Sequence, residues 1–168
     1  MLPIVLDPDS LAIGLSGAGD GMERRLAALA AAGVFPAPVP VDADNEALKG
    51  LAVLFVAGLP LAESRALAVR ARLNGVLVNV EDVPALCDFH VPAVVRRGDL
   101  LVSVSTGGKA PGLARLIRLW LERRLGSEWG THLDDVAQAR EGWRATGHSL
   151  AEVSRRTRAL VREKGWLA

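Results

Sequence analysis

Three segments of the sequence combine residue types and spacings that could do chemistry, and the first is rich in glycine. Gly17-Ala18-Gly19-Asp20-Gly21 lies between an apolar run and a helical pattern. Glycines at such a turn let backbone amides approach a phosphate at a helix N-terminus, as in dinucleotide-binding folds. Asp42 follows 23 residues after Gly19, where a carboxylate can bind an adenosine ribose, so the spacing favours NAD over NADP. A plain tight turn would use the same glycines, and spacing alone leaves both interpretations open.

The second segment is an acidic loop behind an apolar run. Asn79 and Asp82 stand at the end of the run Val76–Val80. Ligands of open α/β sheets bind outside the carboxyl ends of the strands, which makes both residues candidates for a site. A loop with an aspartate that caps a helix is the simpler interpretation of these residues taken alone.

The third segment, Ser105-Thr106-Gly107-Gly108-Lys109, precedes a helical pattern that opens with Pro111. Free amides, two hydroxyls and a lysine together predict a cradle for an anion. The spacing is not that of a Walker A loop, because no Gly-Lys-Ser/Thr follows a glycine five residues earlier. A capped strand-to-helix turn remains the alternative.

Apolar periodicity predicts the elements that must position these segments. Strands and helices alternate over the first two thirds of the chain, which is the pattern of βαβ crossovers and a parallel sheet. The predicted strands are 11–16, 37–41, 51–57, 76–80 and 100–105, and the predicted helices between them are 23–32 and 61–73. We therefore predict an α/β fold, with a Rossmann-like parallel sheet over residues 1–112 and a helical tail over residues 113–168.

The tail has three helical patterns and no strand signal. Its first helix carries an apolar stripe at helical spacing, made of Leu113, Leu116, Ile117, Trp120 and Leu121. A helical segment of this length buries too little area alone to offset its ordering entropy of about 1–2 kcal/mol per residue. We therefore predict that the stripe packs on a second copy of the chain, making a homodimer with the active site near the subunit junction.

Composition excludes several classes of protein. Half of the 168 residues are apolar, which excludes a disordered chain, and the longest apolar stretch, 51–62, is too short and broken to cross a bilayer. The single cysteine and the three scattered histidines show no metal-ligand spacing, so no metal site is predicted. Residues 111–168 hold 11 basic and 7 acidic side chains, or +4, but lack the interleaved aromatics of a nucleic-acid interface. No signal segment is evident, and we expect a cytoplasmic protein.

Two of these segments, with the residues around them, resemble a known family. Residues 79–92, 96–101 and 105–115 are similar to the precorrin-2 dehydrogenase and sirohydrochlorin ferrochelatase family, the N-terminal module of siroheme synthase. A weaker resemblance covers residues 2–4 and 17–25. Beyond about residue 125 the resemblance is only that of a helical dimerisation tail.

The resemblance implies an NAD-dependent oxidoreductase that converts precorrin-2 to sirohydrochlorin, in some members followed by insertion of ferrous iron. It places the essential aspartate on Asp82. It implies cofactor contacts at Gly17, Ala18, Gly19, Asp20, Gly21, Val41, Asp42, Ala57 and Gly58. The substrate, an anionic tetrapyrrole with carboxylates, would be bound by Asn79, Ser105, Thr106, Gly107, Gly108, Lys109 and Arg115.

The departures from the family pattern lie on the cofactor side. Met22 replaces an alanine, Gly58-Leu59 replaces Thr-Asp, and the stretch between Gly33 and Leu51 is shorter than in the family. A relative that binds or chelates tetrapyrroles without NAD-dependent redox chemistry is therefore the alternative function.

Overall fold

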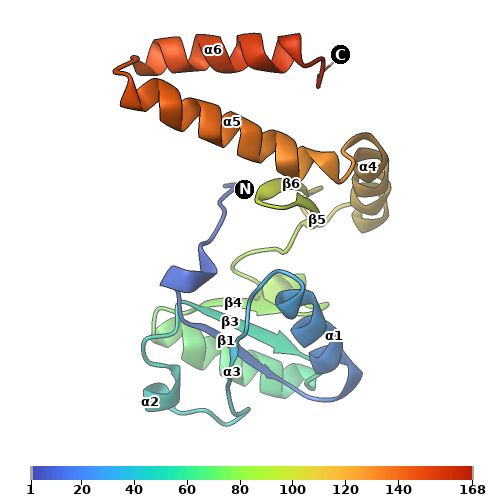
Figure 1. Cartoon of the computed structure of the whole chain (residues 1–168). Coiled ribbons are helices and arrows are strands. Elements are labelled where there is room, and N and C mark those ends of the chain that lie inside the picture. The colour runs from blue at the N-terminus through green and yellow to red at the C-terminus, as the bar shows by residue number, and fades with distance from the viewer. Residues whose placement is uncertain (1, 168) are drawn as a thin grey trace. The chain divides into compact units, whose positions relative to one another are not determined.

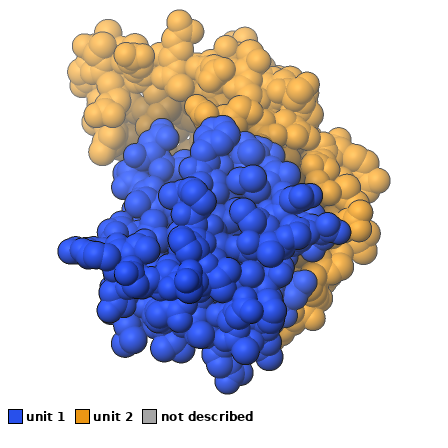
Figure 2. All heavy atoms as spheres, turned by 90° about the horizontal axis from the view of Figure 1, so that it is seen from below, with its two compact units in different colours: residues 1–91 blue, residues 92–168 orange. Residues whose placement is uncertain are grey.

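The computed structural model describes residues 2–167 and contains two compact units, Met1–Val91 and Pro92–Ala168 (Figures 1 and 2). The first unit alternates strands with helices and 3₁₀ turns along the chain. Its elements are η1 (Pro8–Ser10), β1 (Ile13–Gly17), α1 (Gly19–Ala30), β2 (Ala37–Pro38), α2 (Asn45–Leu48), β3 (Val53–Ala57), α3 (Leu61–Leu73), β4 (Leu77–Val80) and η2 (Pro84–Leu86).

The four strands of the first unit form one parallel sheet in the order β2-β1-β3-β4. The chain leaves β1 toward β2 on one side and returns to β3 on the other side, so the strand order reverses between β1 and β3. The crevice at such a reversal is where ligands of open α/β sheets bind. The α/β class and the Rossmann-like parallel sheet predicted from the sequence are confirmed.

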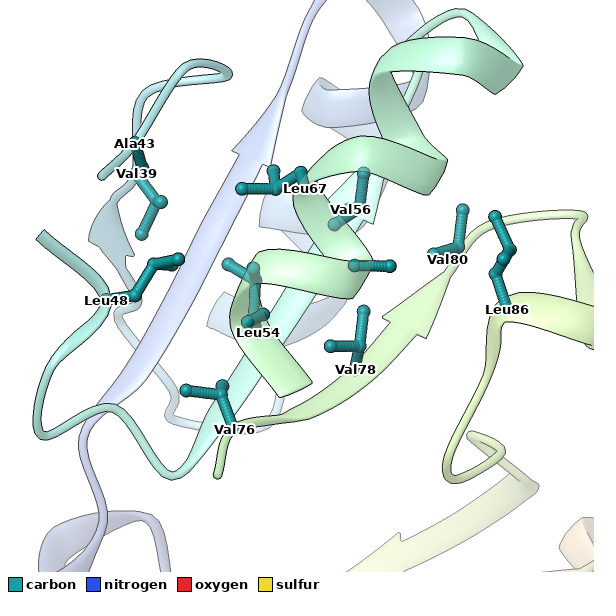
Figure 3. Close-up of a cluster of buried hydrophobic side chains, with 12 residues drawn as sticks. Val39, Ala43, Leu48, Leu54, Val56, Leu67, Val76, Val78, Val80 and Leu86 are labelled. Carbon is teal, nitrogen blue, oxygen red and sulfur yellow. The ribbon is translucent and has the colours of Figure 1, made fainter. Parts of the chain in front are cut away.

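One face of the sheet packs against α3 and holds most of the core (Figure 3). The predicted bounds of this helix, 61–73, are those of the structure. Leu67 and the small residues Ala68 and Ala71 face strand residues such as Leu54 and Val78. These side chains are almost completely buried, and burying each large one contributes about 1.5–3 kcal/mol. The packing against α3 therefore holds the strands, and with them their carboxyl ends, in place.

The opposite face packs against α1 with a smaller cluster. Leu15, Val53 and Phe55 are buried there, and Met22 and Leu29 of α1 pack on them. Consecutive strand residues alternate between the two clusters, as a pleated strand requires. This alternation places α1 directly over β1 and β3, so the glycine-rich turn before α1 lies at the crevice between them.

The second unit begins with an antiparallel hairpin and continues as helices. Its elements are β5 (Ala93–Arg97), β6 (Leu100–Val104), α4 (Pro111–Arg124), α5 (Glu128–Ala145) and α6 (Leu150–Glu163). β5 and β6 pair only with each other within the described residues, so the prediction that 100–105 joins the parallel sheet is wrong. Because this hairpin contacts α4 and α5, the compact units divide after Val91 rather than at residue 112.

The apolar stripe predicted for the tail lies on α4 and is exposed. Ala114 is buried, whereas Leu113 is 52% exposed, Leu116 64% and Trp120 47%. The predicted capping box of the third helix is present, because Ser149 and Glu152 each bond the backbone N–H of the other. The helical character of the tail is therefore confirmed, and its stripe is largely exposed within its own unit, with Leu121 partly buried.

Candidate functional site

The glycine-rich turn lies at the carboxyl ends of β1 and β3 and is packed with little room to spare. The Ala18 N–H donates to the Ala57 carbonyl at 3.2 Å. A Cβ atom at Gly17 would lie 2.2 Å from the Ala57 oxygen, and one at Gly58 would lie 2.1 Å from the Ala18 oxygen. Both positions therefore require glycine. The predicted segments 17–21 and 57–58 are brought together by this packing.

The start of α1 fits the phosphates of a dinucleotide. The helix begins at Gly19, and Ala18 offers no side chain to cap it, so its first amides lack a partner in the helix and have no side-chain cap. Gly19 has φ +57°, and a Cβ atom there would meet nothing within 4 Å, so the space above the turn is open. Exposed amides at a helix N-terminus attract anions. Gly19 and Asp20 lie at this open start of the helix, whereas Gly21 is buried, and the cofactor contacts predicted for the three residues stay predictions.

A pocket of about 420 Å³ lies beside Asp42. It is lined by Val41, Asp42, Glu63, Ala66 and Arg70. The Arg70 guanidinium is already engaged, since it donates to the Val41 carbonyl at 2.8 Å and to the Ala43 carbonyl at 3.0 Å. Arg70 therefore shapes the turn that presents Asp42, and its positive charge lies in the pocket with the two carboxylates. No sequence signal marked Arg70, because its partners lie 27 and 29 residues away.

Asp82 follows β4 in a left-handed backbone conformation, which is uncommon for residues other than glycine. Its φ is +59°, and it is the one non-glycine residue of the described chain with a positive φ. Its carboxylate makes no hydrogen bond or ion pair with residues 2–167, and the residue is exposed. Strained residues of this kind cluster at functional sites. The structure thus leaves the Asp82 carboxylate exposed at this edge of the sheet, and its catalytic role stays a prediction.

The polar neighbours of Asp82 hold the loop together. The Asn79 side-chain amide donates to the Phe89 carbonyl at 2.9 Å, and Asn79 is 7% exposed. Asp88 accepts from Arg72 and from the Val78 N–H, both at 2.9 Å. The structure thus shows Asn79 and Asp88 anchoring the loop, and the substrate contact predicted for Asn79 stays a prediction.

Glu81 is a charged residue at this edge that the sequence interpretation did not select. Its carboxylate would lie 3.0 Å from a Cβ atom at Gly21, so it reaches the start of α1. It pairs there with Arg24 and Arg25. The only available sequence signal was the crowding of acids at 81, 82 and 88, which does not distinguish one from another.

The predicted anion cradle lies in the second unit, ahead of α4. Gly107 and Gly108 both have positive φ, +66° and +77°. The Ser105 hydroxyl accepts from the Gly107 N–H, and the Thr106 hydroxyl accepts from the Ala110 N–H. These hydroxyls are therefore used in shaping the turn, which is the capped-turn interpretation. Lys109 and Arg115 are exposed and remain the candidate cations of this segment.

Arg97, which could have added positive charge to the cradle, has another role. Its guanidinium donates to the carbonyls of Leu125, Gly126 and Glu122. It therefore caps the C-terminus of α4, where the helix leaves carbonyls unpaired. Among residues 2–167 no three metal-ligating side chains gather, and no helix of that part is long and apolar enough to cross a membrane.

Two family models each match part of the chain, one in each unit. The family model described as "Putative NAD(P)-binding" matches residues 4–93, and the model "Sirohaem biosynthesis protein central" matches residues 97–124. The solved structure "SirC, precorrin-2 dehydrogenase" superposes with a TM-score of 0.74 over 100% of this chain and 93% of its own, at 17% identity. At that identity the superposition bears on the fold.

Curated relatives are similar over part of the chain. The siroheme synthase of Methylococcus capsulatus is 42% identical over 93 residues, which are 55% of this chain and 20% of the relative. The siroheme synthase of Pseudomonas paraeruginosa is 53% identical over 60 residues, which are 36% of this chain and 13% of the relative. The chain thus matches about a fifth or less of the length of these relatives. The matches confirm the family resemblance seen in the sequence.

Proposed function

This chain belongs to the NAD(P)-binding family whose model covers its first unit, and from that premise we propose that it is an NAD-dependent precorrin-2 dehydrogenase. The observation that carries the proposal is the strained Asp82 at the same sheet edge as the glycine-rich turn. The names of the similar proteins, siroheme synthase and precorrin-2 dehydrogenase, supply the reaction class. NAD rather than NADP is proposed because Asp42 lines a pocket where its carboxylate can accept hydrogen bonds from the ribose hydroxyls.

Asp82 is the proposed proton acceptor. Dehydrogenation of precorrin-2 removes a hydride and a proton from the macrocycle. The chemistry that NAD supplies when bound is acceptance of the hydride. The Asp82 carboxylate has no partner within the described residues, so it is available to accept the proton. The same carboxylate could accept pyrrole protons in a chelatase step, which is proposed only as a second activity.

The carboxylates of the substrate would be bound through the second unit. The glycine-rich turn before α4, with Lys109 and Arg115, offers amides and exposed cations. Guanidinium and ammonium groups form charge-assisted hydrogen bonds with carboxylates. The basic balance of residues 111–168 adds to this attraction.

Two measurements test the proposed function. Calorimetric titration with NAD should give saturable binding, and anaerobic incubation of precorrin-2 with NAD should produce NADH in step with sirohydrochlorin. Asp82→Asn should keep the affinity for NAD and lose turnover. Tetrapyrrole binding without any NAD binding would contradict the proposal and support the alternative, a relative without redox chemistry.

A homodimer is proposed because the α4 stripe is exposed within its unit. Leu113, Leu116 and Trp120 present large apolar side chains side by side, and a second copy would remove them from water. Light scattering should give about twice 17.8 kDa, and Trp120→Asp should halve that mass. Leu150→Asp, at an exposed leucine at the start of α6, is the matched control. The cytoplasmic location stays a prediction.

A further inference from the structure

The turn that carries Asp82 contacts α1 through an ion pair, and this ion pair has no role in the proposed reaction. Glu81, directly before Asp82, lies 3.7 Å from a terminal nitrogen of Arg25 and 3.8 Å from one of Arg24. The side chains of Glu81 and Arg25 are only 19% and 16% exposed, whereas Arg24 is 66% exposed. Salt and water screen a shielded pair less than a surface pair. The contact between Glu81 and Arg25 is therefore the stronger of the two.

Arg25 itself lies over an aromatic ring. Its guanidinium lies 5.5 Å from the centre of the Phe55 ring, and Phe89 contacts Phe55 edge-on with the ring centres 5.5 Å apart. Its Nε is buried and has no acceptor within residues 2–167. A buried donor without a partner lowers stability, so this placement calls for an explanation. The Arg25 guanidinium thus lies next to the Glu81 carboxylate, although its Nε has no hydrogen-bond acceptor in that position.

The backbone around Asp82 needs such support. The turn from Val80 to Val83 contains one backbone hydrogen bond, from the Val83 N–H to the Val80 carbonyl, at 3.3 Å, and the Cys87 sulfur lies 3.2 Å and 3.4 Å from the carbonyl oxygens of Val80 and Val83. The Glu81 N–H donates to the Val56 carbonyl at 2.9 Å, which fixes the start of the turn to β3. A positive φ at a residue other than glycine persists only where the surroundings enforce it. The Glu81 side chain is the contact that ties this turn to α1.

We propose that Glu81 is a positioning residue for Asp82. Its pairing with Arg25 fixes the turn 80–83 against α1, the helix whose N-terminus carries the glycine-rich turn. The Asp82 carboxylate is thereby kept at a constant distance from the amides that would hold the cofactor. The catalytic consequence rests on the proposed function, whereas the fastening of the turn does not.

The test compares Glu81→Gln with Glu46→Gln. Glu46 is the matched control, because it is exposed and pairs with Lys49 at 3.0 Å elsewhere on the same unit. Glu81→Gln should lower kcat by about tenfold, since misplaced catalytic groups lose rate steeply, and leave the Kd for NAD within about twofold. Hydrogen exchange at the Val83 N–H should become about tenfold faster, while the unfolding midpoint in urea stays near that of Glu46→Gln.

A double-mutant cycle assigns the effect to the pair. Arg25→Gln should lower kcat as Glu81→Gln does, and the double variant should be no slower than either single variant. If the Arg25→Gln variant does not fold, the comparison of Glu81→Gln with Glu46→Gln decides the question alone. Glu81→Gln is expected to fold, because the Glu81 side chain makes no hydrogen bond within residues 2–167 that the substitution would break.

The inference is overturned if Glu81→Gln matches Glu46→Gln in both kcat and exchange at Val83. The inference is also overturned if Glu81→Gln lowers the affinity for NAD or the free energy of unfolding along with kcat, because a merely structural residue would lower them together. If the unsubstituted chain does not oxidise precorrin-2, the proposed function fails. In that case exchange at Val83 still decides whether Glu81 fastens the turn.

Discussion

Replacing Asp82 by glycine and by alanine should reverse the usual stability order of these two residues. Both substitutions remove the carboxylate, so the difference between them reports the backbone conformation alone. At a position with negative φ, a variant with glycine is less stable than one with alanine by about 0.5–1 kcal/mol, because glycine loses more conformational entropy on folding. Asp82 has φ +59°, where a Cβ atom costs about 1–2 kcal/mol and glycine has none.

The two effects combine to favour glycine at this position. Subtracting the entropy cost from the relieved strain leaves Asp82→Gly more stable than Asp82→Ala by about 0.5–1 kcal/mol. Lys49 provides the control, since it is exposed and has φ −63°. There Lys49→Gly should be less stable than Lys49→Ala by about the same amount.

Urea unfolding of the four variants measures the effect. Equal slopes within each pair would show that the denatured states expose the same surface, so the midpoints report stability directly. Both Asp82 variants should also lose turnover, although one is the more stable. An Asp82→Ala variant that is as stable as Asp82→Gly would refute the claim that Asp82 is strained.

Three further predictions concern the glycine turn, the ribose pocket and the last helix. Gly17→Ala should destabilise the first unit by about 1–3 kcal/mol and weaken NAD binding, because its Cβ atom would lie 2.2 Å from the Ala57 oxygen; Gly142→Ala, in an open position of α5, should instead stabilise by about 0.5–1 kcal/mol in the same unfolding assay. Asp42→Asn should raise the affinity for NADP relative to NAD by about tenfold in paired titrations, and an unchanged ratio would exclude Asp42 as the discriminating residue. Ser149→Ala should destabilise α6 by about 1 kcal/mol near neutral pH. The Ser149 N–H and hydroxyl both donate to the Glu152 carboxylate and hold the pKa of Glu152 below its ordinary value of 4.5, so the stabilisation from these bonds is present above pH 4.5 and is lost as the pH falls through the lowered pKa. Alanine keeps the bond from the N–H and removes the bond from the hydroxyl. The difference between wild type and Ser149→Ala should therefore shrink in acid, and a difference independent of pH would contradict this account.

Local sequence patterns were enough to predict most of the elements in the first unit. The helix predicted at 61–73 has those bounds in the structure, and the strand at 51–57 differs from β3 by two residues at its start. Both segments are rich in apolar residues and are bounded by glycine or proline, so neighbouring residues carry the signal. The glycine-rich turn and the capping box at Ser149 were also legible for this reason, since each depends on residues at most four positions apart.

The contacts between residues that are far apart in the sequence were decided by the tertiary structure. The strand β5 went unpredicted because it is five residues long and ends in two arginines, and its pairing with β6 removed residues 100–104 from the parallel sheet. Arg97 caps α4 across more than 20 residues, and Arg70 holds the turn at Val41 across 29. Asp82 has a positive φ, which a sequence ordinarily announces with glycine, and its turn is bonded to β3 through the Glu81 N–H and to Cys87 further along the chain. Such contacts depend on which faces pack together, and no local periodicity encodes that choice.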